Sequence, residues 1–153
     1  MTAVLDLSPG PVVQPRLNTA AAEVARLVNA ARAALLGSGT AVTVEQIAEA
    51  RGTSTDAVRQ WMSRRRKAGD LATVTHEGVA LVPTFQLDDA FDARPEAAAI
   101  VSRLIEYGMS GWAVWDWAEV PSGWLDGETP ADLIRAGRVG EVDVAVDGLV
   151  ANA

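Results

Sequence analysis

Residues 43–67 read TVEQIAEARGTSTDAVRQWMSRRRK, and this stretch decides the fold. Thr43 is a typical N-cap for a first helix that runs to Arg51, and Gly52 suits the turn that follows. Ser54 is a typical N-cap for a second helix, which continues through the basic segment behind it. The sequence therefore predicts two helices joined by a tight turn.

The small and apolar residues of this stretch have a regular spacing. Ala48 is followed four positions later by Gly52, then six positions later by Val58, and three positions after that by Trp61. A small Ala lets two helices cross closely, Gly tolerates the turn backbone, and the last two residues bury the inner face of the second helix. The spacing resembles the helix-turn-helix family, and this resemblance implies DNA binding. The alternative is a helix pair that only packs.

The outward face of the second predicted helix suits the major groove of DNA. At about 100° per residue, Val58 and Trp61 share one side while Gln60 and Lys67 share the opposite one. Glutamine matches adenine and arginine matches guanine in the groove, and hydroxyl and basic groups suit phosphates. The predicted DNA-binding residues are Ser54, Thr55, Asp56, Arg59, Gln60, Ser63, Arg64, Arg66 and Lys67.

Two simpler interpretations of this face stay open. The basic run at residues 64–67 is also what a solvated helix end carries, because cations are favourable near a C-terminal dipole. Asp56 in the first turn is likewise favourable near the N-terminal dipole without reading cytosine. If the run does bind phosphates, the affinity will fall steeply with salt.

Outward from this stretch, residues 71–83 predict a β-hairpin that resembles a wing. LATVT and VALVP are two short strands around HEG, where Gly78 is able to take a positive φ. On the other side, apolar residues at helical spacing predict a helix over 19–36, whose alanine-rich faces suit packing within this chain or against a second copy. We expect a DNA-binding domain over residues 19–85, preceded by a flexible, proline-containing arm over residues 1–18.

The rest of the chain predicts a small helical domain. Residues 86–94 form an acidic connector, and residues 95–153 form the partner-binding domain. Caps, prolines and glycines predict helices over 95–107, 110–120 and 130–137, and the last segment, 139–152, fits both a strand and a helix, with helix expected. The expected fold class is mainly α: a helix-turn-helix with a small β-hairpin wing, followed by a small C-terminal helical domain.

Charge and composition separate the two halves and argue against catalysis. The net charge is −7, but residues 1–83 carry +2 and residues 84–153 carry −9. The chain has no Cys and a single His76, with no catalytic motif, metal-ligand spacing or phosphate loop. We therefore expect no enzyme activity, no cofactor and no metal, and we interpret Asp88, Asp89 and Asp92 as a solvated linker rather than a cation site.

Four of the five tryptophans lie within residues 112–124. The predicted helix there is apolar nearly all round, so its aromatic rings either form the core of a bundle or face a partner. Both alternatives stay open, and different rings can serve each. The predicted partner-binding residues are Trp112, Trp115, Trp117, Trp124, Leu125, Asp126, Gly127, Thr129, Pro130, Leu133 and Ile134.

The segment 117–149, WAEVPSGWLDGETPADLIRAGRVGEVDVAVDGL, resembles the C-terminal toxin-binding domain of Xre/MbcA/ParS-type antitoxins. The resemblance rests on an aromatic and proline segment, a Leu-x-Gly-x-Thr-Pro turn at residues 125–130, and a final apolar helix. It implies an antitoxin that neutralises a cognate RES-type, NAD-consuming toxin through this domain. It also implies that the protein represses its own promoter through the helix-turn-helix.

The hairpin departs from this family, because it is more like winged or excisionase-type DNA readers. The alternative function is therefore an excisionase-like or phage-type transcriptional regulator whose C-terminal half only oligomerises, and a third is a pure interaction module. The expected partners are double-stranded DNA and a toxin protein, in a homodimer or a higher hetero-oligomer, because two half-sites multiply a modest affinity. No targeting or membrane segment is visible, so we expect a cytoplasmic protein.

Overall fold

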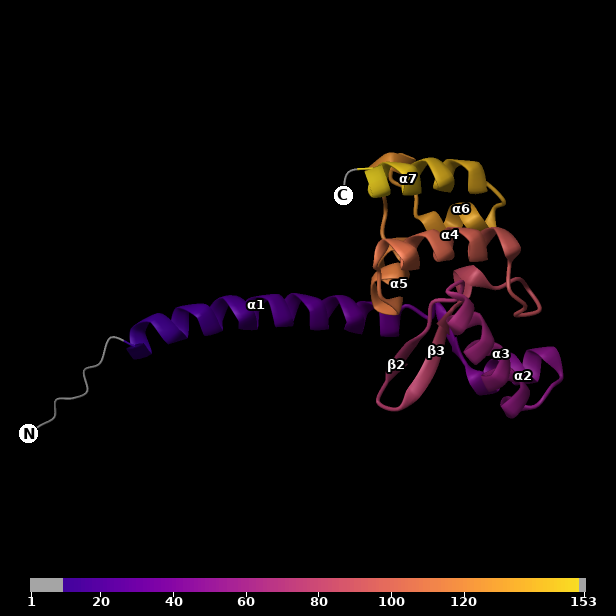
Figure 1. The fold of residues 1–153 in the computed structure, drawn as a ribbon, viewed down its shortest axis with the longest axis horizontal. Helices are drawn as coiled ribbons and strands as arrows, with labels where there is room; N and C mark the ends of the chain where they lie inside the picture. Colours follow the sequence, from indigo (N-terminus) through magenta and orange to yellow (C-terminus); the bar gives the residue numbers. More distant parts are fainter. Residues whose placement is uncertain (1–9, 152–153) are drawn as a thin grey trace, which may run out of the picture. The chain divides into compact units, whose positions relative to one another are not determined.

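The computed structural model describes residues 10–151 and the side chains from residue 19 onward. The fold is mainly helical with a small antiparallel sheet, as predicted (Figure 1). The helices are α1 (Gly10–Gly37), α2 (Val44–Arg51), α3 (Thr55–Ala68), α4 (Pro95–Tyr107), α5 (Gly111–Glu119), α6 (Pro130–Arg135) and α7 (Val139–Ala151). The strands are β1 (Ala41–Thr43), β2 (Val74–His76) and β3 (Val79–Pro83), and two short 3₁₀ helices are η2 (Thr84–Gln86) and η3 (Gly123–Leu125).

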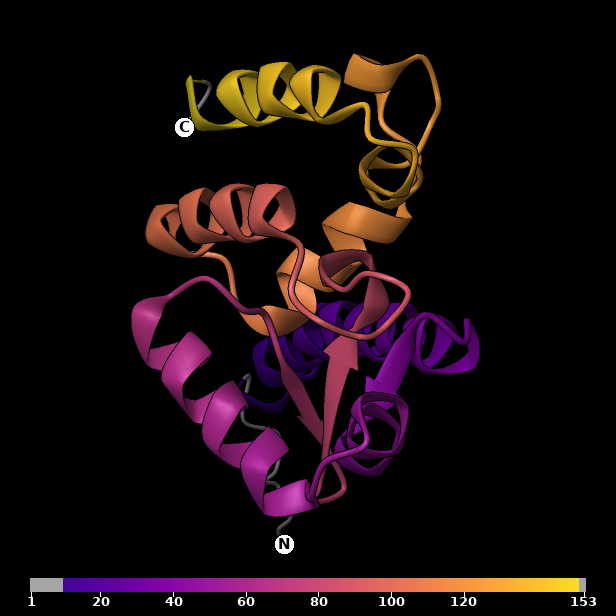
Figure 2. The same ribbon diagram turned by 90° about the vertical axis from the view of Figure 1, so that its right-hand side faces the viewer.

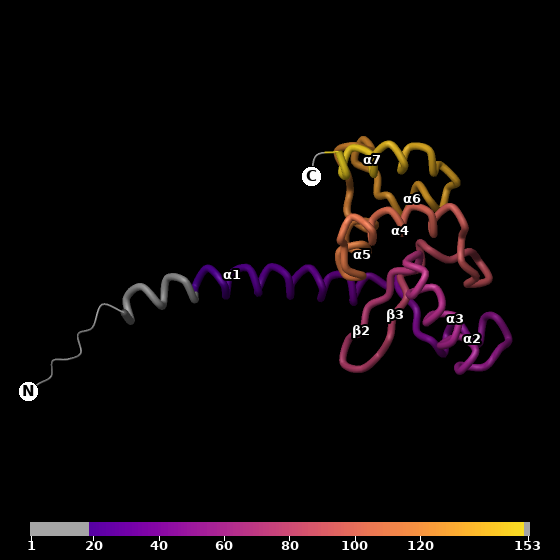
Figure 3. Tube along the Cα trace, in the orientation of Figure 1, coloured from indigo at the N-terminus to yellow at the C-terminus, as the bar shows by residue number. Residues whose placement is uncertain are grey.

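The chain divides into two compact units, Met1–Ala34 and Leu35–Ala153. Over the residues that the structure describes, the first unit consists of residues 10–34 of α1, and the last three residues of this helix belong to the second unit (Figure 3). All other elements belong to the second unit. Among residues 10–151, no helix combines the length and the apolarity that crossing a membrane requires.

Helix α1 begins earlier than the sequence predicts. Residues 1–9 of the expected arm lie outside the described residues, and residues 10–18 are helical, so the helix predicted over 19–36 begins nine residues earlier. Pro11 falls in the first turn, where a backbone N–H has no helical partner and a proline therefore loses nothing. Pro11 is therefore compatible with the start of this helix.

Local capping sets the ends of α2 and α3. The Thr43 hydroxyl accepts from the Gln46 N–H while the Gln46 side chain accepts from the Thr43 N–H, which makes a reciprocal capping box. Gly52 ends α2 in the left-handed region at φ +65°, and the Ser54 hydroxyl accepts from the Ala57 N–H to start α3. The predicted bounds of both helices are confirmed.

The sheet has the order β1-β3-β2, and all neighbours are antiparallel. The predicted hairpin is present as β2–β3, but β2 begins at Val74 and includes His76, so Leu71–Thr73 of the predicted first strand are not part of it. The turn residues Glu77 and Gly78 have φ angles of +50° and +79°, as a tight two-residue turn requires. Strand β1 was not predicted. Its Ala41 and Thr43 pair with Pro83 and Leu81, which lie about 40 residues further along the chain.

The second unit contains two main apolar cores. α2, α3 and the sheet enclose one, and α4–α7 enclose the other at the opposite end of the unit (Figure 2). Ala72 and Phe85, which flank the hairpin, are buried in the α4–α7 core. A third, smaller cluster joins Leu35, Val74 and Trp115. Residues of the hairpin and its flanks thus take part in all three of these clusters.

Gln86 and Gly111, neither of which has an apolar side chain, connect the hairpin to the C-terminal part of the second unit. Gln86 is 2% exposed, and its amide donates to the carbonyls of Ala72 (2.9 Å) and Pro83 (3.1 Å) and accepts from the Ala72 N–H (2.7 Å). Gly111, the first residue of α5, lies so close to Thr73 that an added Cβ would stand 1.9 Å from the Thr73 carbonyl oxygen. The backbone around the hairpin is therefore closely fitted to α5.

The C-terminal helices follow their sequence signals. α4 has the predicted bounds and ends at Gly108 with φ +113°, and Ser110 and Thr129 cap α5 and α6. Residues 139–151 form a helix, α7, rather than the strand that their alternating pattern also fits. The helix is favoured because it buries Val142, Ala145 and Val146 together on one face of the core.

Candidate nucleic-acid interface

Helix α3 is amphipathic in the way that its sequence predicts. Val58 and Met62 are buried and Trp61 is partly buried against α2 and the sheet. The structure places the predicted DNA-binding residues on the other side or at the helix start. Arg59, Gln60, Arg64, Arg66 and Lys67 are exposed, Ser54 and Asp56 are exposed at the N-terminus, and Thr55 and Ser63 are half-buried.

The basic run at residues 64–67 divides between the two faces. Arg65 points inward, where its Nε lies 3.2 Å from the Asp70 carboxylate. Among residues 10–151, no carboxylate lies within ion-pair distance of Arg64, Arg66 or Lys67. Three cations of the run are therefore directed to solvent without a protein counterion, which is what a phosphate backbone requires.

Arg59 differs, because it shares the face with two acidic side chains. Its guanidinium nitrogens lie 3.7 Å from Glu45 and 3.6 Å from Asp56, and all three side chains are exposed. Exposed pairs of this kind contribute about 0–1 kcal/mol, so a stronger ligand displaces them at little cost. Asp56 therefore lies in the first turn of α3, near the positive end of the helix dipole, and pairs with Arg59. This agrees with the simpler interpretation of Asp56.

The turn of the hairpin lies beside the start of α3. Gly78, Val79 and Ala80 line one shallow pocket together with Glu45 and Arg59. The exposed residues of the turn carry one acidic group, Glu77, and no lysine or arginine. Positive charge near the hairpin therefore comes from α3.

Arg51 has a structural role that the sequence analysis missed. Its guanidinium stacks on Trp61 at 4.0 Å and donates to the Phe91 carbonyl oxygen from Nε (2.9 Å) and Nη2 (2.5 Å). Nε also lies 3.2 Å from the Asp92 carboxylate. Burial lowers the pKa of Arg51, and the nearby Asp92 and Asp88 oppose that shift. The signal in the sequence is weak, because the Arg and its acceptor are 40 residues apart.

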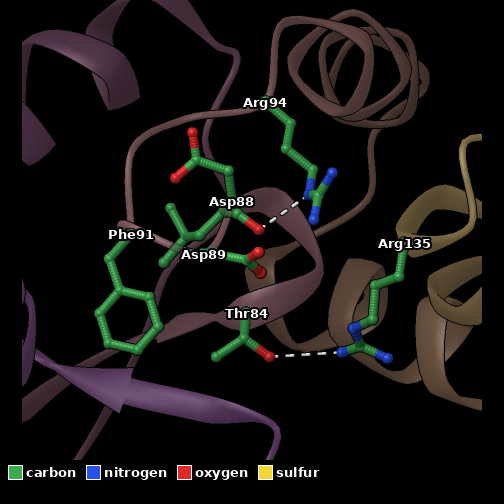
Figure 4. A pocket seen from close by; sticks show the side chains of 7 residues that line it. Thr84, Asp88, Asp89, Phe91, Arg94 and Arg135 are labelled. Atoms are coloured by element: carbon green, nitrogen blue, oxygen red, sulfur yellow. Dashed lines mark hydrogen bonds between the residues drawn. The ribbon is translucent and has the colours of Figure 1, made fainter.

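The acidic connector is an ordered loop. The Asp88 carboxylate accepts from the N–H groups of Ala90 (2.9 Å) and Asp92 (3.0 Å), while the side chains of Asp89 and Asp92 are exposed. Figure 4 shows a pocket beside this loop in which Arg135 reaches the Thr84 hydroxyl, at 3.3 Å. Within the described residues, no three metal-ligating side chains are grouped closely enough to hold a cation.

Five of the eleven predicted partner-binding residues are buried rather than on the surface. Trp115, Leu125, Pro130, Leu133 and Ile134 are buried in this chain's own cores, so their prediction as surface contacts needs correction. The Trp115 indole N–H donates to the Thr40 hydroxyl at 3.0 Å, and Trp112 stacks on Trp115 at 5.7 Å. Trp112 and Trp117 are partly buried, and Thr129 caps α6. Trp115 is buried, and Trp112 and Trp117 are partly buried, because α5 is covered on several sides.

One tryptophan is mainly exposed. Trp124 on η3 is 61% exposed, and its ring lies against α7 where Gly148 has no side chain: an added Cβ would stand 2.9 Å from the ring. Val144, one turn before Gly148, is also 61% exposed. Trp124, Val144 and Gly148 form an apolar surface, here called the Trp124 patch. The predicted residues Asp126 and Gly127 are exposed next to Trp124 in the chain.

Comparison with known proteins supports the fold and goes no further. No family model matches the chain, and no curated protein matches it. Among solved structures, the chain is similar to the NMR structure of Rv2175c, with a TM-score of 0.58 and 18% sequence identity over 72% of this chain and 80% of that one. At this identity the likeness shows a shared fold.

Proposed function

We propose that this protein is a DNA-binding transcriptional regulator in which α2 and α3 form a helix-turn-helix and the β2–β3 hairpin is its wing. The observation that carries the proposal is the outer face of α3. It presents Gln60 together with three cations that no carboxylate of the described residues pairs with, while its inner face is fixed in the core by Val58 and Met62. A rigid helix with this face fits the major groove.

The geometry suggests a division of labour on α3. Arg59, Gln60 and Arg64 lie on the central part of the exposed face, where side chains reach base edges. Arg66 and Lys67 lie at the C-terminal end and Ser54 and Thr55 at the start, where phosphates flank the groove. Arg59 exchanges its two exposed carboxylate partners for DNA when it binds.

We predict that Arg59→Ala and Gln60→Ala each weaken binding to DNA from the protein's own promoter by roughly 5- to 150-fold, the loss expected for one base contact. Fluorescence anisotropy at fixed salt measures the affinity. Arg138→Ala is the matched control, because it removes an exposed cation immediately before α7 that pairs with Glu128 and Glu141. Unchanged affinity in both α3 variants would remove these residues from the readout.

A second candidate function rests on the Trp124 patch. A tryptophan that is 61% exposed beside an exposed valine is typical of a protein-binding surface. We infer that this patch, in the acidic half of the chain, binds a basic surface of a partner protein. The antitoxin resemblance makes that partner a RES-type, NAD-consuming toxin, with repression of the shared promoter by α3.

Co-expression with the adjacent reading frame tests this second function. If the neighbour is a toxin, we expect the wild-type protein to protect cells and Trp124→Ala to lose that protection by at least tenfold in colony count. Val120→Ala is the control, because Val120 is also exposed but is not part of the Trp124 patch. A neighbour that neither harms cells nor binds would favour the excisionase-like or phage-type regulator instead.

A further inference from the structure

Up to Ala34, helix α1 has no other described element of its own unit to pack against. Over the described residues, the unit Met1–Ala34 contains this one helix and no other element. A single helix is only marginally stable in water, and most helices in proteins depend on covering an apolar face. The question is therefore which surface covers α1.

The helix carries one apolar stripe. Val24, Leu27, Val28 and Ala31 lie within an arc of about 100° on a helical projection. Val24 and Leu27 are 62% and 61% exposed, and Val28 is 42% exposed. The stripe contains no charged residue, and the nearby Glu23 forms an ion pair with Arg26 on the same helix. Covering the stripe therefore desolvates no charged group.

The order of large and small residues along the stripe is self-complementary. Val24 and Ala31 lie at equal distances from the midpoint between Leu27 and Val28. When two copies run antiparallel about that midpoint, Val24 of each copy faces Ala31 of the other, so a larger residue meets a small one at both ends of the contact, and Leu27 faces Val28 at its centre. A parallel pair would instead place Ala31 against Ala31 and leave a gap.

We propose that this stripe binds the same stripe on a second copy of the chain, in antiparallel orientation, to form a two-fold symmetric dimer. A two-fold contact uses one patch twice, which is what a self-complementary stripe provides. The dimer stands apart from the proposed DNA binding, because it is formed and measured without DNA. Its failure and the failure of that function are therefore distinguishable.

Sedimentation equilibrium of the full chain at micromolar concentration tests the dimer. We expect twice the 16.1 kDa chain mass for the wild type and at least a tenfold weaker association for Leu27→Glu. Ala33→Glu is the matched control, because it adds the same charge on the opposite side of α1 and should leave the dimer intact. A monomeric wild type, including one in which the stripe covers the rest of its own chain, overturns the proposal. Equal behaviour of the two variants also overturns it.

Cysteine cross-linking tests the orientation, since the chain has no cysteine of its own. Val24→Cys and Ala31→Cys chains, one of them lengthened by a tag, are mixed and oxidised with air and copper phenanthroline. We expect a mixed disulfide of intermediate size and no disulfide in Ala31→Cys alone. Efficient cross-linking of Ala31→Cys alone would indicate a parallel pair and would overturn the antiparallel arrangement.

Discussion

Gly111→Ala is expected to lower the free energy of unfolding by about 3 kcal/mol or more. The added Cβ would stand 1.9 Å from the Thr73 carbonyl oxygen and 2.9 Å from its carbonyl carbon, so one backbone must move. Neither moves easily. Ala72 and Val74 on either side of Thr73 are buried in separate clusters, and Ser110 caps α5 immediately before the glycine.

Urea denaturation and thermal melting measure this effect, and a loss of that size lowers the Tm of a domain this large by about 6–12 °C. Gly140→Ala is the matched control. It makes the same change inside α7, where no atom lies within 4 Å of the added Cβ, and alanine favours the helix. We expect Gly140→Ala to be as stable as the wild type or slightly more so. Equal stability of the two variants would show that the contact at Gly111 relaxes freely.

Gln86→Leu is expected to cost about 3–5 kcal/mol, because it leaves three buried backbone groups without a partner. The side chain now satisfies the N–H and carbonyl of Ala72 and the carbonyl of Pro83. Leucine has nearly the same volume, so the loss is of hydrogen bonds rather than of packing. The groups lie where the hairpin joins the α4–α7 core, far from water.

The matched control for Gln86→Leu is Gln60→Leu, the same substitution on the exposed face of α3. We expect Gln60→Leu to change stability by less than about 0.5 kcal/mol, as exposed substitutions generally do. Denaturation of both variants by urea gives the comparison. A small and equal effect in the two would mean that other donors or water replace the Gln86 amide.

What the sequence predicted well is what local chemistry decides. Thr43, Ser54, Ser110 and Thr129 each cap the helix that begins after them, so these boundaries depend on residues within one turn. The glycine stops and the hairpin turn are local in the same sense. For this reason the positions of α2 to α7 and of the β2–β3 hairpin follow from the sequence.

What the sequence missed depends on residues far apart. β1 is three residues long and exists because β3 pairs with it from about 40 residues away. In the sequence, Arg51 is one more cation of the basic half. Only the fold shows that it donates to the Phe91 carbonyl and stacks on Trp61. The tryptophans divide for the same reason: Trp115 donates to Thr40, which lies 75 residues away in the chain, whereas the ring of Trp124 lies against α7 at Gly148. No spacing within residues 112–124 distinguishes them.

The Trp115–Thr40 hydrogen bond has a consequence for how the second unit unfolds. α5 supplies the ring that covers Leu35 and Val74, and the α4–α7 core supplies the cover for Phe85. Loss of the C-terminal helices would thus uncover the segments that carry β1, β2 and η2. We therefore expect α4–α7 and the sheet to unfold together, and we expect a fragment ending at Gln86 to lack contacts that cover its sheet.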